Sequence, residues 1–135
     1  MKKAFTLIEL IIVIIIVGIL GSLGITQYNR VIEKSRAAEA RMVLGTIRAA
    51  QAAYKLENGV YATALINLGV SAPEDCNQTT HYYYYLVNPA GSGINRALRC
   101  VGTTGKQPGW QRSYLIQLTP QGQWGCSPDH AWVCH

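Results

Sequence analysis

The sequence predicts an α+β fold in which one long amino-terminal α-helix carries a small antiparallel β-sheet. An apolar run at the start continues into an amphipathic segment without an intervening proline. Short strand-like runs then alternate with Gly-, Pro- and Asn-rich connections that are too short for crossover helices. The 135 residues suffice for one small core and not for two.

The apolar run extends from Phe5 to Ile25 and contains one charged residue, Glu9. As a helix it would be about 31 Å long, the thickness of a bilayer. An ionised carboxylate in hydrocarbon is costly unless it is paired or neutralised, so Glu9 needs a partner or a proton. The alternative is that Glu9 lies at headgroup depth near Lys2 and Lys3 and is merely tolerated.

Gly18, Gly21 and Gly24 stand three residues apart near the end of the apolar run. Each costs about 1 kcal/mol of helix stability relative to alanine, so the helix should bend or unwind most easily here. A second, compatible interpretation is that small residues let neighbouring helices approach closely.

The helix is expected to end at Asn58-Gly59, a good left-handed cap. Its second half has an apolar stripe at helical spacing, which should pack on the sheet: Ala40, Val43, Leu44, Ile47, Ala50 and Tyr54. Another face has cations seven residues apart: Lys34, Arg41, Arg48 and Lys55. Such a line is usually solvated. The sharper hypothesis is that it meets acidic groups on adjacent copies or an anionic ligand.

Beyond the helix, a short helical turn is expected at 64–68 and strands at 81–87, 97–103, 113–119 and 123–126. In the first strand, Tyr82 and Tyr84 should face one side of the sheet and Tyr83 and Tyr85 the other. The residues after the last strand should form a loop held by a disulfide.

The four cysteines all lie in the second half of the chain: Cys76, Cys100, Cys126 and Cys134. An even number beyond a membrane segment indicates two disulfides in an oxidising compartment, outside the cytoplasm. Sequence order favours Cys76–Cys100 and Cys126–Cys134 among three possible pairings. A metal set of Cys126, His130, Cys134 and His135 is disfavoured, because structural zinc sites use C-x2-C pairs.

Nothing in the sequence indicates catalysis or a cofactor. It contains no G-x-S-x-G, H-E-x-x-H or phosphate-loop motif, so the protein is not expected to be an enzyme. The net charge of +5 is modest. Four scattered cations follow the helix, too few for a DNA site: Arg96, Arg99, Lys106 and Arg112. Nucleic acid is therefore not an expected partner.

The opening residues, MKKAFTLIELIIVIIIVGILG, resemble the leader and first helix of type IV pilins and the related pseudopilins of type II secretion. The segment AAQAAYKLENGVYATALINLG (49–69) also looks like the place where the helix of those proteins ends and the head begins. The resemblance implies that a prepilin peptidase cuts between Ala4 and Phe5 and methylates Phe5. Most members have glycine before the cut, but alanine is the next smallest residue, so cleavage is still expected.

The resemblance also implies a partner for Glu9: the new amine of Phe5 on a neighbouring subunit. Opposite charges about 4 Å apart attract by about 4 kcal/mol even at an effective dielectric constant near 20. The implied organisation is a leader (1–4), a membrane and filament-core helix (5–28), its amphipathic continuation (29–58) and a disulfide-stabilised head (59–135).

The function that the resemblance implies is that of a structural subunit of a type IV pilus, serving adhesion, motility or DNA uptake. The alternatives are a pseudopilin, or a minor tip pilin that acts as a binding module. Expected partners are other copies, the peptidase, an inner-membrane assembly platform and a cytoplasmic ATPase. The subunit should wait in the bacterial inner membrane, crossing it once with the head outside the cytoplasm. It would then enter an extracellular pilus, or a periplasmic pseudopilus in the alternative.

Overall fold

The computed structural model of the protein describes residues 5–76, 81–87, 91–101, 113–128 and 131–134, with all of their side chains except those of residues 26, 131 and 134. The chain divides into two compact units, Met1–Glu33 and Lys34–His135. It has one long helix and a four-stranded antiparallel sheet, so the α+β prediction is confirmed.

Helix α1 (Leu7–Asn58) is continuous over 52 residues, as the lack of proline predicts. It ends where the sequence places its cap. Gly59 has φ +77°, and its N–H donates to the carbonyl of Lys55 at 2.8 Å. This left-handed conformation satisfies one of the last carbonyls of the helix and turns the chain away from the axis.

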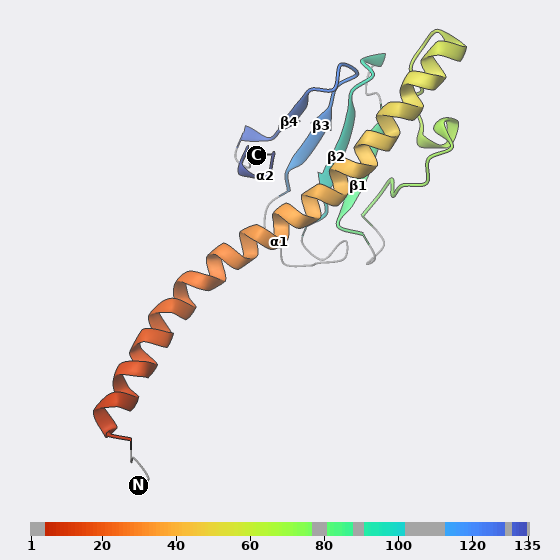
Figure 1. The fold of residues 1–135 in the computed structure, drawn as a ribbon. Coiled ribbons are helices and arrows are strands. Elements are labelled where there is room, and N and C mark those ends of the chain that lie inside the picture. The colour runs from red at the N-terminus through yellow and green to blue at the C-terminus, as the bar shows by residue number, and fades with distance from the viewer. Residues whose placement is uncertain (1–4, 77–80, 88–90, 102–112, 129–130, 135) are drawn as a thin grey trace. The chain divides into compact units, whose positions relative to one another are not determined.

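The sheet is a simple meander (Figure 1). Strands β1 (Tyr83–Val87), β2 (Asn95–Arg99), β3 (Leu115–Leu118) and β4 (Trp124–Cys126) lie in the order of the sequence, and each pairs antiparallel with the next. The second strand was expected at 97–103 but begins earlier. Asn95 pairs with both Val87 and Leu118, so ladder hydrogen bonding draws two polar residues into the strand.

The inner face of the sheet packs on the second half of α1. Tyr83, Tyr85 and Val87 of β1 are buried and Tyr84 is half-buried, so the predicted alternation is confirmed within the strand. Tyr82 precedes the strand and packs against the core, so the alternation is shown only from Tyr83 onward. In the central row, Ala97 stands between Tyr85 and Ile116. The helix contributes Ala37, Ala40, Leu44 and Ile47 to the same core.

The predicted apolar stripe of α1 is correct for Ala40, Leu44 and Ile47 but wrong at its end. Gln51 is buried there, while Ala50 and Tyr54 are half-buried. The helical period leads from position 47 to 51, and the polar side chain is accepted because both ends of its amide are bonded. Nε2 donates to the carbonyl of Ala62 and Oε1 accepts from its N–H, each at 2.9 Å.

Two short helical segments complete the fold. The predicted turn at 64–68 is the 3-10 helix η1 (Leu65–Leu68), which buries Leu65 and ends at Gly69 with φ +64°. The carboxy-terminal loop prediction is wrong, because helix α2 (Ala131–Cys134) lies there. Its Val133 is buried in the core, and this apolar contact favours a compact turn over an open loop.

Candidate functional site

The start of α1 holds the acidic residue that the sequence singles out. Thr6 precedes the first helical residue, and Glu9 lies in the first turn. One carboxylate oxygen of Glu9 accepts hydrogen bonds from the backbone N–H of Thr6 at 2.9 Å and from its hydroxyl at 2.6 Å. The N–H of Glu9 donates back to Thr6 Oγ1 at 3.4 Å. These reciprocal bonds form a capping box, which satisfies two backbone donors of the helix start.

The capping box gives Glu9 a partner within its own chain, which the sequence reasoning missed. The signal was present, because T-x-x-E directly before an apolar run is the pattern of a capping box. The predicted pairing of Glu9 with a neighbour's Phe5 amine is untested and stays a prediction. Ala4, on the other side of the predicted cut, lies outside the described residues.

The apolar run that follows is uncovered in the single chain. Its large side chains are between 42% and 82% exposed. By length and composition, α1 is apolar enough in this part to cross a membrane. A side chain added at Gly18, Gly21 or Gly24 would meet nothing within 4 Å. Packing within the chain therefore gives no reason for these glycines, and their predicted role in helix flexibility stays a prediction.

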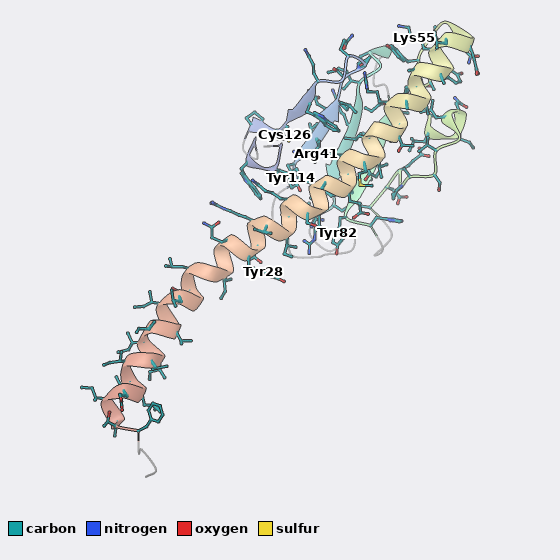
Figure 2. All side chains as sticks on the ribbon, in the orientation of Figure 1. Tyr28, Arg41, Lys55, Tyr82, Tyr114 and Cys126 are labelled. Atoms are coloured by element: carbon teal, nitrogen blue, oxygen red, sulfur yellow. A yellow bond between two sulfur atoms is a disulfide. The ribbon has the colours of Figure 1, made fainter. Side chains whose placement is uncertain are left out.

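In the second half of α1, two of the cations that were predicted to lie on a solvated face instead donate hydrogen bonds to backbone carbonyls of the head. Arg41 lies on the part of α1 that passes the sheet (Figure 2). It donates from Nη2 to the carbonyl of Val133 at 2.7 Å, and its guanidinium lies 5.8 Å from the ring centre of Trp124. Arg48 donates from Nε to the carbonyl of Pro120 at 2.9 Å. Both bonds are charge-assisted and partly buried, which strengthens them.

Lys55 completes this pattern, with its ammonium 4.3 Å from the ring centre of Tyr61. Lys34, the first member of the line, is exposed. The prediction of a wholly solvated basic face is therefore wrong for Arg41 and Arg48. Their seven-residue spacing places them on one side of α1, where they reach carbonyls and rings of the same chain. They are not free to meet an anionic ligand.

Two known families match this chain, one over the start of α1 and one over the second half of α1 and much of the sheet. A prokaryotic N-terminal methylation motif matches residues 1–25, which include Glu9 and the whole apolar run. A family described as type IV pilin-like G and H matches residues 37–115, more than half of the 135-residue chain. The chain belongs to this pilin-like family. None of the curated proteins compared with it matches.

Membership of the pilin-like family gives each of the two matched regions a general role. The methylation motif and the apolar helix fit membrane anchoring before assembly, and pilins in general are processed by a prepilin peptidase and assembled into pili. The second match begins at Ala37, the first helix residue of the core, and runs into β3. The family therefore includes the contact between α1 and the sheet.

Of the four cations considered for a DNA site in the pilin head, the structure describes two, Arg96 and Arg99. Arg99 is only 1% exposed. Its Nη1 donates to the carbonyls of Tyr82 at 3.1 Å and Cys100 at 2.9 Å, so this residue is wrong as a DNA-contacting candidate. Arg96 is half-buried on β2. Lys106 and Arg112 lie outside the described residues.

A disulfide joins Cys76 to Cys100, the pairing that sequence order favours. Cys126 is also disulfide-bonded, which removes it from the alternative metal set. The side chain of Cys134 and both His130 and His135 lie outside the described part, so the second pairing stays a prediction. Among the described residues, no group of three or more His, Cys, Asp or Glu is placed to hold a metal.

Proposed function

We propose that the chain is a structural subunit of a type IV pilus on the bacterial surface, without catalytic activity. One observation carries the proposal: the apolar half of α1 is exposed along its length and begins at a methylation motif. Such a surface is stable in lipid or against like helices, and not in water. Assembly moves it from lipid into a filament core, which costs little net hydrophobic free energy.

The proposed sequence of events begins with removal of residues 1–4 between Ala4 and Phe5, which creates a methylated amine on Phe5. While the subunit waits in the inner membrane, Thr6 holds the Glu9 carboxylate through the capping box. In the filament, that carboxylate pairs with the Phe5 amine of a neighbouring copy. A subunit displaced by one turn would leave both charges unpaired in hydrocarbon, so the pair also fixes the register.

The proposed organisation keeps residues 5–28 as the membrane and filament-core helix, 29–58 as its amphipathic continuation and 59–135 as the head. Partners are further copies, the prepilin peptidase, the assembly platform and a cytoplasmic ATPase. The Cys76–Cys100 disulfide suits a head that lies outside the cytoplasm. Adhesion, motility and DNA uptake are the activities that such a filament would serve.

The test is to shear filaments from cells and analyse them by mass spectrometry. The proposal expects this chain as an abundant component that begins at methylated Phe5. As a matched control, an Ala4→Leu variant places a bulky residue at the cut and should remain uncut in the membrane. Absence of the chain from filaments, while it is processed and present in the envelope, would contradict the pilus role and favour a pseudopilin.

A further inference from the structure

The compact unit Lys34–His135 has a recess lined in part by polar side chains that form no hydrogen bonds within the described part of the chain. It lies between α1, the segment at 71–73 and the start of β1, and measures about 340 Å³ with its opening to solvent included. Its walls include Val43, Ala72 and Pro73 on the apolar side. The N–H of Tyr85 donates to the carbonyl of Pro73 at 2.7 Å, which fixes this segment against β1.

Four polar side chains line the same recess: Glu39, Ser71, His81 and Tyr85. Among the residues that the structure describes, none of these side chains has a hydrogen bond or an ion pair. Tyr85 is only 5% exposed. Its hydroxyl is not among the buried unpaired atoms, so it reaches the solvent in the recess, as do the exposed side chains of Glu39 and Ser71, and all three can bond to a ligand there.

The charge of the lining residues indicates which class of ligand the recess can bind. Among the described residues that line the recess, Glu39 is the one carboxylate and none is a lysine or an arginine. Arg36 lies over the Tyr82 ring, 4.5 Å from its centre, but does not line the recess. An anion would therefore meet an uncompensated carboxylate, whereas a cation would be attracted.

The burial of Tyr85 and the nearby charge of Glu39 both raise the pKa of the Tyr85 phenol. The phenol therefore stays neutral, and its oxygen can accept a hydrogen bond. Together with the Glu39 carboxylate and the Ser71 hydroxyl it provides three acceptors. A primary ammonium group has three donors and no acceptor, which matches this set.

We propose that this recess binds a primary ammonium group on an aliphatic chain, as presented by a lysine side chain or a free diamine. The ammonium donates to Glu39, Ser71 and Tyr85, and the methylene chain lies along Val43, Ala72 and Pro73. The site lies wholly within the compact unit Lys34–His135, so it goes beyond the proposed filament role and does not depend on it.

The test uses the full-length chain, labelled with nitrogen-15, in detergent micelles. Nα-acetyl-lysine methylamide and 1,5-diaminopentane are titrated separately while amide shifts of Ser71, Ala72 and Tyr85 are followed. Nα-acetyl-norleucine methylamide, which keeps the chain but lacks the ammonium, is the neutral comparison. Saturable shifts with either amine and none with norleucine support the site. The tighter amine then identifies the source as a protein lysine or a free diamine.

Two variants locate the binding. Glu39→Gln keeps the shape of the side chain but removes its charge, and should weaken amine binding at least tenfold. Tyr85→Phe removes one acceptor and should weaken it about fivefold. Glu57→Gln removes an exposed acid from the same helix outside the recess and should change nothing. Thermal unfolding confirms that each variant is folded.

The proposal is overturned if the norleucine compound binds as well as the lysine compound, or if Glu39→Gln binds the amines unchanged. It is equally overturned if these amide shifts respond to a divalent metal ion or a neutral sugar while both amines leave them unmoved.

Discussion

Gln51 and Ala62 bond to each other through two hydrogen bonds, each 2.9 Å long and buried. The side-chain amide of Gln51 thereby bonds both backbone groups of Ala62, as a neighbouring strand would in a sheet. This contact fixes the chain just after the end of α1, where it turns back towards η1 and the sheet.

Replacing Gln51 with alanine should destabilise the head. Both backbone groups of Ala62 would lose their partner while Ala62 remains buried, and each unpaired group costs about 1–3 kcal/mol. We expect the free energy of unfolding in urea to fall by about 2–4 kcal/mol. The control is Gln121→Ala at an exposed turn position. A loss below about 0.5 kcal/mol, the range of ordinary surface changes, would contradict the role given to Gln51.

Arg48→Met should show that the cation line of α1 supports the head. Methionine keeps much of the aliphatic stem but removes the bond to the Pro120 carbonyl, so stability should fall by about 1.5–3 kcal/mol. Lys34→Met removes the exposed member of the same line and should change stability by less than about 0.5 kcal/mol. Equal effects from the two variants would mean that the line acts only through its general charge.

Removing the disulfide with Cys76→Ala and Cys100→Ala should lower stability by about 3.5 kcal/mol in the chain-entropy treatment. The bond closes a loop with a sequence separation of 24 that contains β1 and all of β2. Urea unfolding of the double variant, compared with the oxidised wild-type chain, measures the effect. A loss larger than predicted by more than about 1 kcal/mol would mean that the buried Cys100 also contributes through packing, and a loss below about 1 kcal/mol would contradict the prediction.

The raised pKa of Tyr85 predicts a loss of stability in alkali. Burial is the first cause and the Glu39 charge the second, so the folded state favours the neutral phenol. Its contribution is fully present below the unfolded pKa of about 10 and declines at higher pH, by up to about 1.4 kcal/mol per pH unit.

Urea unfolding between pH 8 and 11 measures this decline. Tyr85→Phe should remove its share, and Glu39→Gln should reduce it, because the charge that opposes ionisation is gone. An alkaline decline that is identical in Tyr85→Phe and wild type would show that Tyr85 makes no such contribution.

The sequence predicts well where local chemistry is decisive. The proline-free run and its periodicity locate α1, and Asn58-Gly59 marks its end. Alternation in the tyrosine run correctly separates buried Tyr83 and Tyr85 from their neighbours. The first helical turn was also predictable, since Thr6 and Glu9 have the spacing of a capping box, although that signal was overlooked.

Long-range contacts explain what the sequence could not predict. Arg41 and Arg48 bond to carbonyls 92 and 72 residues later, and no local pattern indicates such partners. Arg99 resembles a surface cation in sequence but is buried, because two carbonyls accept from its guanidinium. Strand β2 begins at Asn95 because its neighbours on both sides pair there.

The central claim is that Glu9 is retained in an apolar helix because leader cleavage gives a neighbouring copy a positive amine. The most direct measurement is the amount of sheared filament formed by cells that express Glu9→Ala, with cleavage and membrane level of the variant checked in parallel. The account predicts a normally cleaved subunit that accumulates in the membrane and forms few or no filaments. Filaments of normal length and amount from the Glu9→Ala chain would contradict it.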